Sequence, residues 1–393
     1  MPAAIVAIGD IGVIDGMIHI GDEAMFEAFV DEMRRRGISR FTGISSVPAE
    51  SADRYGIDAI ERIGFGGDRA ANEARMRAVI RTAEGSNELD PADPARAVIA
   101  AIAGSDGVAV TGGGNMASIW SHHVFERATI GAIAAALGKP LVVTGQTIGP
   151  ELDRDDAGLV HDLLASAELV GLREPSSVQL CRALGLSNLT PTVDDASYLV
   201  AEPSERSDPG DYCLVSLASH VGDADRDAVV SAVAAMLDGI PLDIVFLAHF
   251  GALDPAVSRG DSVMHDRVIA AMTTPARVIA PTDSPTAARL ARGAGMVVSS
   301  RYHPVVFAVP AGVPTIGIPV DDYTGVKLRG ALGNFGQQGV LPVQQLLDGE
   351  GPATAERVLA NRTTISNDAA RLSEERRAAS TQWWDRVAAT FGS

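Results

Sequence analysis

Short apolar runs alternate with longer helical patterns along most of this chain, and no other feature of the sequence constrains the fold as strongly. The runs are continuous in valine, isoleucine and leucine, as in strands buried on both faces. One helical stretch, Ser118–Leu137, is followed by Gly138 and then by Lys-Pro, which end helices. This βαβ rhythm predicts parallel, doubly wound sheets. The expected strands are Ala4–Ile8, Arg40–Ile44, Gly107–Thr111, Leu141–Thr144 and Leu169–Leu172, then Tyr212–Leu217, Leu242–Ala248, Arg277–Ala280, Met296–Ser299 and Thr315–Ile318.

The rhythm is interrupted by Ala201–Asp211, a polar stretch with two prolines and a glycine that is typical of a linker. The chain, at 393 residues, is also too long for one compact core. We therefore expect two tandem Rossmann-like α/β domains, 1–203 and 211–393, that face a common cleft. A final helix, Ser366–Phe391, should dock on the body. Its apolar stripe is Leu372, Ala379, Trp383, Val387 and Phe391.

Composition and charge exclude several classes of protein. The chain is 46% hydrophobic and 21% charged, as ordinary globular proteins are, and no apolar run reaches the roughly 20 residues that span a bilayer. Its start reads as a strand, not a signal peptide. Cys181 and Cys213 form no ligand or disulfide pattern, which favours a reducing cytoplasm. His122 and His123 lack metal-site spacing, so we expect no metal. We also expect no cofactor.

The net charge of −18, with no dense basic cluster, argues against nucleic acid as a partner. An anionic ligand would instead need cations gathered locally, against the field of the whole protein. Ligands of open α/β sheets bind at the carboxyl ends of the strands. The joints between strands and helices are therefore the places to look for those cations.

Two joints in the first domain are rich in glycine. In "TGGGN", Gly113 and Gly114 would let backbone N–H groups approach a phosphate or carboxylate, and Asn115 adds an amide. The same glycines could equally serve only a tight turn. "TGQTIGP" has the same logic after the next strand, with Gln146 as its polar side chain.

Two further joints carry charge. Arg173 of "GLREPSS" leaves a buried strand just before a helix, and an arginine there needs a partner. That partner is either Asp194 or Asp195 of "VDDAS", which would be structural, or an anionic ligand held bidentately. In "HIGDEAM", Asp22 either caps a helix or contacts a sugar hydroxyl.

The second domain contains the stretch "SSRYHPVVFAVPAGVPTIGI". Pro304 suits the first position of a helix, which would put His303 at the N-cap and Arg301 two residues before it. Anions are favoured at that end of a helix, and imidazole titrates near neutral pH. The stretch therefore predicts an anion site with a proton donor, or else a histidine that merely caps a helix. Lys327, expected in a glycine-bounded loop, adds a cation, and His249 ends a strand at the same edge.

Taken in order, "HIGDEAM", "TGGGN", "GQTIGP", "LREPSS", "DDAS" and the Arg301–His303 stretch followed by a lysine resemble the polysaccharide pyruvyl transferase family, over roughly residues 1 to 340. The resemblance implies a GT-B-like fold and transfer of pyruvate from phosphoenolpyruvate to two sugar hydroxyls, giving a cyclic ketal. It implies that Arg173, Arg301 and Lys327 clamp the donor while His303 acts as general acid. The residues that would contact substrate are Asp22, Gly113, Gly114, Asn115, Gln146, His249 and Lys327.

Two positions depart from the family pattern. Pro304 stands where a small or apolar residue follows the histidine, and Tyr323 precedes Lys327 by four positions instead of three. The implied acceptor is a lipid-linked or nucleotide-linked sugar of a cell-envelope glycan precursor, modified in the cytoplasm or at the inner face of the membrane. Two alternatives remain open: a GT-B-like glycosyltransferase, whose nucleotide ribose would meet Asp321 or Asp322, and a non-catalytic sugar-phosphate binding protein.

Overall fold

The computed structural model describes residues 3–200 and 210–392, which form two compact units. Unit 1 comprises Met1–Val13, Met25–Asp195 and Ala379–Ser393, and unit 2 comprises Ile14–Ala24 and Ala196–Ala378. The expected linker, Ala201–Asp211, falls mostly on residues 201–209, which lie outside the described residues. The two units differ from the expected domains, 1–203 and 211–393, because an early segment joins unit 2 and the end of the chain joins unit 1.

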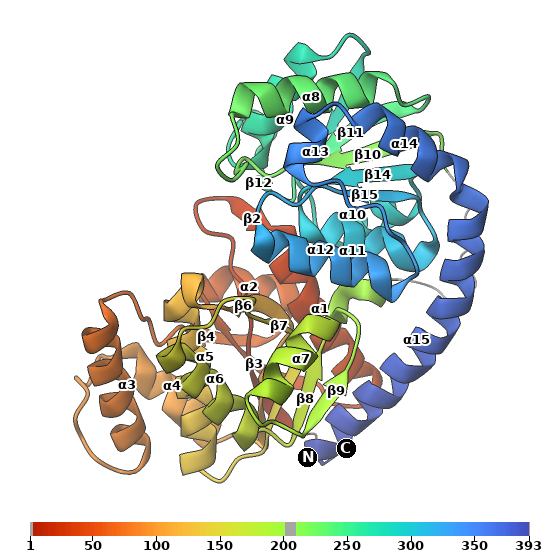
Figure 1. The fold of residues 1–393 in the computed structure, drawn as a ribbon. Helices are drawn as coiled ribbons and strands as arrows, with labels where there is room; N and C mark the ends of the chain where they lie inside the picture. The colour runs from red at the N-terminus through yellow and green to blue at the C-terminus, as the bar shows by residue number, and fades with distance from the viewer. Residues whose placement is uncertain (1–2, 201–209, 393) are drawn as a thin grey trace. The chain divides into compact units, whose positions relative to one another are not determined.

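Unit 1 is built on one parallel sheet (Figure 1). Its strands are β1 (Ala4–Ile8), β3 (Arg40–Ser45), β4 (Asp58–Glu61), β5 (Gly107–Val110), β6 (Gly113–Met116), β7 (Leu141–Ile148), β8 (Leu169–Leu172) and β9 (Leu189–Pro191). The order is β4-β3-β1-β5-β7-β8-β9, and β6 pairs with the outer part of β7. All of these pairings are parallel, as the continuous apolar runs predict.

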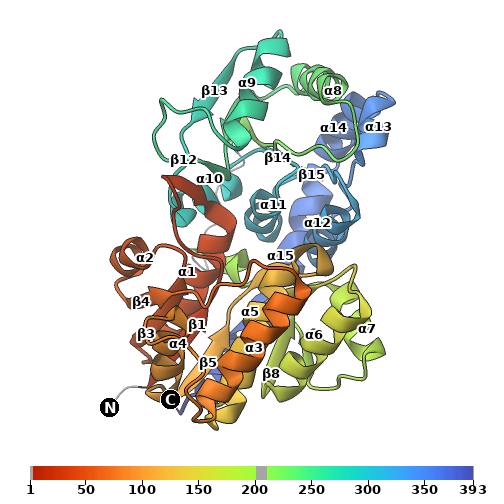
Figure 2. The ribbon, with the colours of Figure 1, turned by 90° about the vertical axis from the view of Figure 1, so that its left-hand side faces the viewer.

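Helices cover both faces of this sheet. They are α1 (Ile20–Arg35), α2 (Pro48–Tyr55), α3 (Arg69–Ala83), α4 (Pro94–Ala103), η1 (Ser118–Trp120), α5 (Ser121–Ala136), α6 (Arg154–Ser166) and α7 (Pro175–Ala183). Alternate residues of β1 enter different cores: Val6 and Ile8 pack with α3 to α7, whereas Ile5 and Ala7 pack with α1 and α2. Helices α3 and α5 pack directly on each other, as Figure 2 shows.

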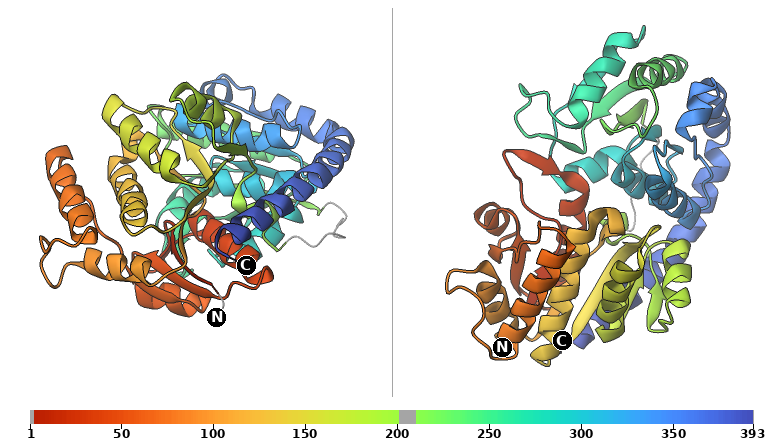
Figure 3. Two further views of the ribbon diagram at one scale, coloured as in Figure 1. Left: turned by 90° about the horizontal axis from the view of Figure 1, so that it is seen from below. Right: turned by 60° about the vertical axis from the view of Figure 1, so that its left-hand side comes forward.

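The last helix, α15 (Arg362–Thr390), runs from unit 2 into unit 1. Its final turns bring Trp383, Trp384 and Phe391 into the core beneath α1, which confirms the expected docking. Figure 3 shows this end of α15 close to the start of the chain. Burying an aromatic side chain of this size stabilises a fold by roughly 2–3 kcal/mol. Ala379 of the expected stripe is exposed, because the core contacts begin only at Trp383.

Unit 2 has a five-stranded parallel sheet in the order β13-β11-β10-β14-β15. Its strands are β10 (Tyr212–Ser216), β11 (Asp243–Leu247), β13 (Ala276–Ile279), β14 (Met296–Ser299) and β15 (Thr315–Gly317). A separate antiparallel pair joins β2 (Met17–His19) to β12 (Phe250–Ala252). The helices are α8 (Arg226–Asp238), α9 (Asp261–Ala271), α10 (Ser284–Arg292), α11 (Tyr302–Ala308), η3 (Val309–Ala311), α12 (Asp322–Asn334), α13 (Val343–Leu347) and α14 (Gly351–Ala360), and η2 (Asp195–Tyr198) leads in from unit 1.

Both units are therefore Rossmann-like, as the sequence predicts. Every expected strand is present with ends within one residue of those predicted, except that Leu141–Thr144 continues to Ile148. Among the described residues, no helix combines the length and the apolar composition that crossing a membrane requires.

Candidate functional site

The joint after β14 in unit 2 differs from its expected geometry by two residues. Arg301, not His303, is the N-cap of α11, with extended backbone angles of φ −88° and ψ 145°. Its position is set by Ser299, whose hydroxyl accepts from the Arg301 N–H at 2.9 Å and donates to the Arg301 carbonyl at 2.8 Å. His303 and Pro304 lie inside the first turn. Proline is tolerated there because the first four N–H groups of a helix have no partner within it.

Arg301 is held by a carboxylate from the start of α9. Its Nε and Nη2 atoms donate to both oxygens of Asp261, at 2.6–3.1 Å. Asp261 is fully buried, and one of its oxygens also accepts from the Phe250 N–H at 2.9 Å. The guanidinium lies 5.7 Å from the centre of the Phe250 ring. One edge of the guanidinium is thus held by Asp261 and the Phe250 ring lies beside the group, while the side chain stays 26% exposed.

His303 is buried, and two aromatic rings and a glycine lie against it. Its ring lies 5.9 Å from that of Phe307 and 5.1 Å from that of Tyr302, centre to centre. Gly21, the second residue of α1, comes so close that an added Cβ would lie 2.0 Å from His303 Nδ1. The glycine of "HIGDEAM" is therefore the space into which the histidine ring fits.

Two further histidines near this joint are uncharged. Burial lowers the pKa of His249 to about 3 and that of His265 to about 4. His249 lies against Phe307 and within hydrogen-bond distance, 3.1 Å, of the Ser216 hydroxyl, and His265 accepts from the Leu217 N–H. They add no positive charge beside His303.

Lys327 lies on α12, not in the expected glycine-bounded loop. Asp321 caps this helix by accepting from the Thr324 N–H at 2.7 Å, in a capping box that lets the helix run through the following glycines. The Lys327 ammonium lies 4.3 Å from the centre of the Tyr323 ring and 5.2 Å from that of Tyr302. Asp321, which the glycosyltransferase alternative would place against a ribose, therefore has a structural role as the cap of α12.

Asp22 is not the cap of α1, because the helix already begins at Ile20. Its carboxylate lies 2.9 Å from His19 Nδ1. Burial would lower the pKa of His19, but the charge and the hydrogen bond of Asp22, together with the charge of Asp261, outweigh burial and raise it.

In unit 1, Arg173 pairs with Asp194, which is the structural one of the two alternatives that the sequence left open. Its Nη1 donates to Asp194 at 2.5 Å, and its Nε contacts Glu174 at 3.0 Å and the Thr147 hydroxyl at 2.7 Å. The Arg173 side chain is only 1% exposed, and neither of its two carboxylate partners is more than 2% exposed. Glu174 was not anticipated, although it is the next residue of "LREPSS".

The glycines of "TGGGN" and "TGQTIGP" make room for a protein carboxyl. Asp195 accepts from the Gly112 N–H at 3.0 Å and from the Thr144 hydroxyl. An added Cβ would lie 2.8 Å from Asp195 at Gly112 and 2.4 Å from it at Gly145, whose φ is +44°. Burial raises the pKa of Asp195 to about 7 despite the hydrogen bond from Thr144.

The glycines of "TGGGN" that were expected in a loop between strand and helix lie in a strand instead, and their contact with a ligand stays a prediction. Gly113 and Gly114 lie in β6, which pairs with β7, and an added Cβ at Gly113 would meet the Gln146 side chain at 3.1 Å. Gln146 is fully buried within β7, where its amide nitrogen donates to the Thr111 carbonyl.

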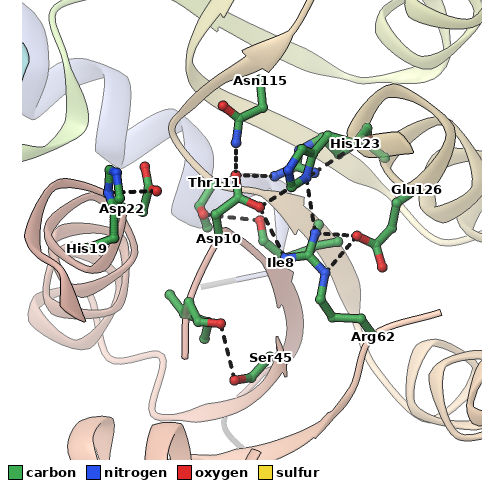
Figure 4. A network of polar contacts seen from close by, with 12 residues as sticks. Ile8, Asp10, His19, Asp22, Ser45, Arg62, Thr111, Asn115, His123 and Glu126 are labelled. Carbon is green, nitrogen blue, oxygen red and sulfur yellow. Dashed lines mark hydrogen bonds and ion pairs between the residues drawn. The ribbon is translucent and has the colours of Figure 1, made fainter. Parts of the chain in front are cut away.

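A buried charge network at the end of β1 was missed (Figure 4). Asp10 contacts Arg62 at 3.1 Å and Arg127 at 2.7 Å, and it accepts from the Asn115 amide. Burial would raise the pKa of Asp10, but the charges of Arg127 and Arg62, with the hydrogen bond from Arg127, outweigh burial and hold that pKa below its ordinary value. Asp10 lies two residues after the end of the first strand, which was the available signal. Its partners lie too far along the chain to be paired with it by pattern.

His123 lies within this network and is uncharged. Burial lowers its pKa to about 4, against the opposing effect of Asp10. The described residues contain no cluster of three or more histidine, cysteine, aspartate or glutamate side chains that could hold a metal ion.

A family model for "Polysaccharide pyruvyl transferase" matches residues 19–322, which is more than half of the chain. The chain belongs to the polysaccharide pyruvyl transferase family. The match contains all the candidate residues of the sequence analysis except Lys327. A sequence search of curated proteins gave no match.

This member of the pyruvyl transferase family is similar in fold to solved structures of a glycosyltransferase, of UGT89C1 and of a UDP-GlcNAc 2-epimerase. The calicheamicin glycosyltransferase CalG4 aligns with a TM-score of 0.57 and 16% identity over 100% of this chain and 99% of its own. Arabidopsis thaliana UGT89C1, solved with UDP-L-rhamnose, aligns with a TM-score of 0.57 and 12% identity over 100% of this chain and 99% of its own. UDP-GlcNAc 2-epimerase from Neisseria meningitidis aligns with a TM-score of 0.53 and 10% identity over 94% of this chain and 98% of its own. These likenesses show a GT-B-like fold alone, because the same fold carries different reactions.

Proposed function

We propose that this chain transfers pyruvate from phosphoenolpyruvate to two hydroxyls of a sugar in a cell-envelope glycan precursor, forming a cyclic ketal. Family membership supports pyruvyl transfer to polysaccharide. The observation that carries the chemistry is the joint of β14 and α11, where an oriented cation, Arg301, stands two residues from an enclosed imidazole, His303.

Phosphoenolpyruvate carries a phosphate and a carboxylate, so its site needs more than one cation. Arg301 is oriented by Asp261 through Nε and Nη2, and Lys327 has aromatic rings beside its ammonium group. An arginine fixed in this way loses little conformational freedom when it binds an anion. Arg173 is left out of the proposed donor site, because Glu174 and Asp194 already balance its charge.

His303 would act as the general acid. It protonates the methylene carbon of the enol, the π bond between the two carbons supplies the electron pair for the new C–H bond, and the central carbon takes oxocarbenium character. A sugar hydroxyl attacks that carbon and its proton returns to His303. The bond to phosphate then breaks with its electron pair, and the second hydroxyl closes the ketal while its proton leaves on phosphate. Positioned proton transfer of this kind contributes typically 10²–10⁴-fold.

The surroundings of His303 suit this role. A bound dianion favours the imidazolium form, and His249 and His265 stay uncharged because they are buried. The positive charge of the site therefore rests on the groups that would meet the donor. Electrostatic stabilisation of the leaving phosphate by Arg301 and Lys327 would add to the proton transfer.

The test is to incubate the protein with phosphoenolpyruvate and a panel of simple glycosides, and to follow phosphate release and product mass. We expect stoichiometric phosphate and a product heavier than the acceptor by one pyruvate less one water. A parallel incubation with nucleotide sugars tests the glycosyltransferase alternative, for which the product would gain one hexose. Saturable donor binding without turnover would instead identify a binding protein and refute the proposal.

A further inference from the structure

The start of α1 holds an ionisable pair that the proposed chemistry does not use. His19 is the last residue of β2 and directly precedes α1, and Asp22 lies in the first turn of that helix. The Asp22 carboxylate lies 2.9 Å from His19 Nδ1, as Figure 4 shows. The pair is accessible, because the His19 side chain is 41% exposed and that of Asp22 is 22% exposed. With Nδ1 turned to the carboxylate, the ring meets a ligand through Nε2.

Packing within unit 2 holds this pair beside the proposed general acid. Gly21 lies between the two residues in sequence, and an added Cβ at Gly21 would lie 2.0 Å from His303 Nδ1. Consecutive Cα atoms are about 3.8 Å apart, so the backbone of Asp22 is one such step from this contact and that of His19 is two. The pair and the His303 ring therefore belong to one small region of unit 2.

Phe250 places the same pair beside the oriented arginine of the proposed donor site. It is the partner of His19 in the β2–β12 ladder, and the two rings are 5.4 Å apart, centre to centre. The Arg301 guanidinium lies 5.7 Å from the centre of the same Phe250 ring. The backbone here is fixed, because the Ile20 N–H donates to the His249 carbonyl at 2.9 Å. His19 and Arg301 are therefore neighbours of one aromatic ring.

The charges around His19 favour a ring that can take up a proton. Asp22 on α1 and Asp261 on α9 raise the pKa of His19 above its ordinary value, against burial and against the opposing charge of Arg301 at the start of α11. An imidazole that titrates near the working pH is an effective general base, because both of its protonation states are accessible there.

The proposed reaction needs a second proton acceptor. His303 carries a proton again once the first hydroxyl has added to the central carbon, so it cannot take the proton of the second hydroxyl. A positioned base accelerates such a proton transfer by typically 10²–10⁴-fold. A carboxylate that holds an imidazole in one orientation and tautomer, as Asp22 would hold His19, is also how serine proteases position their base.

We propose that His19, positioned by Asp22, is the general base that takes the proton of the second sugar hydroxyl as the ketal closes. After the bond to phosphate has broken with its electron pair, the oxygen of that hydroxyl bonds to the central carbon and its proton moves to His19 Nε2. His19 then passes the proton to the departing phosphate, so the overall balance is unchanged. His19 is a catalytic residue in this scheme, and Asp22 is a positioning residue. The inference rests on the proposed function, because it assigns a step of that reaction.

Steady-state kinetics of pyruvyl transfer in His19→Gln test the base directly. Glutamine keeps a polar side chain but takes up no proton near neutral pH. We expect kcat to fall by roughly 10²-fold or more, because the proton acceptor is lost. The Kd for phosphoenolpyruvate, measured by calorimetry, should stay within about twofold of the wild-type value, since the cations of the donor site are unchanged. His161→Gln is the matched control, because His161 is 43% exposed and lies 3.1 Å from Asp162 in another histidine–aspartate pair.

The pH profile separates a base from a merely structural residue. In the wild type, kcat should rise with pH as His19 loses its proton. Asp22→Asn removes a charge that raises the pKa of His19, so this rise should move to lower pH. In His19→Gln the rise should be absent. Circular dichroism checks that both variants fold.

The outcomes distinguish this inference from the proposed function. Wild-type kcat in His19→Gln, or the same rise of kcat with pH in the wild type and both variants, would overturn the base and leave pyruvyl transfer standing. A loss of donor affinity as large as the loss of kcat would make His19 a donor ligand and also overturn the base. If the wild type forms no ketal with any glycoside, the proposed function fails and the base fails with it.

Discussion

Arg173 in unit 1 and Arg301 in unit 2 stand at similar joints between a strand and a helix. Each closely follows a buried strand and precedes a helix with a proline in its first turn. Arg173 is 1% exposed and lies between two buried carboxylates, whereas Arg301 is 26% exposed and has one. The same sequence pattern therefore places an arginine in two different settings. In unit 1 the arginine binds two of the protein's own carboxylates, whereas in unit 2 part of the arginine side chain stays accessible.

The most severe expected effect is on catalysis, from the unit 2 joint. His303→Ala should lower pyruvyl transfer by roughly 10²–10⁴-fold, because the proton donor is lost. His220→Ala is the control, since that histidine is 69% exposed in the same unit. Rates of phosphate release check the prediction, with circular dichroism to show that the fold is retained. A folded variant with unchanged turnover would rule out the general-acid role.

A large effect on stability is expected from the other arginine. Arg173→Ala leaves Glu174 and Asp194 buried without their counter-charge, which should destabilise unit 1 by roughly 3–5 kcal/mol. Arg182→Ala, exposed on the following helix, is the control. All three tryptophans lie in unit 1, so denaturant unfolding followed by their fluorescence reports on this unit. If stability is kept and the KM for phosphoenolpyruvate rises instead, Arg173 is a donor ligand, as the family resemblance implies.

A smaller effect on catalysis is expected from a residue that carries no chemistry. Gly21→Ala puts a Cβ where the ring of His303 now lies, so the ring must shift. Misplacing a catalytic group by about 1 Å can cost on the order of 10²-fold, and we expect a loss of roughly 10–100-fold in kcat. Gly333→Ala on α12 has open space around its Cβ and is the matched control. Wild-type kcat in Gly21→Ala would mean that the ring is not held by this contact.

The last prediction concerns how the stability of unit 1 depends on pH. Burial raises the pKa of Asp195 from 3.8 to about 7, so the folded state binds its proton more tightly than the unfolded state. This contribution to stability is full at low pH and falls as pH rises from about 4 to about 7, by up to about 1.4 kcal/mol per pH unit. Asp195→Asn, which mimics the neutral acid, should lack that slope. Parallel curves for wild type and Asp195→Asn across this range would show that the carboxyl is ionised throughout.

The fold could be predicted from the sequence almost completely, because strands buried on both faces leave an unmistakable apolar pattern. What failed was local. The helix after β14 was expected to begin at Pro304 because proline favours a first position, but proline is equally tolerated throughout the first turn. Lys327 was placed in a loop because glycines surround it, yet the capping box at Asp321 and Thr324 starts a helix there.

The residues of the candidate site could be predicted only where they lie close to one another in the sequence. Arg301 and His303 are two residues apart, so the pattern showed them together. The role of Gly21 depends on His303, far along the chain, and the two glycine motifs depend on Asp195 in the same way. A glycine shows only that something approaches the backbone. Whether that is a ligand or a protein side chain is decided by long-range packing, which no local pattern contains.

The central claim is that the joint of β14 and α11, with Lys327, binds the donor. Calorimetric titration with phosphoenolpyruvate tests it most directly, in the wild type and in Arg301→Gln, Lys327→Gln and the control Arg277→Gln, an exposed cation of the same unit. Loss of one charge-assisted hydrogen bond should weaken binding roughly 10–100-fold in each of the first two variants and leave the control unchanged. Wild-type affinity in both Arg301→Gln and Lys327→Gln would contradict the account.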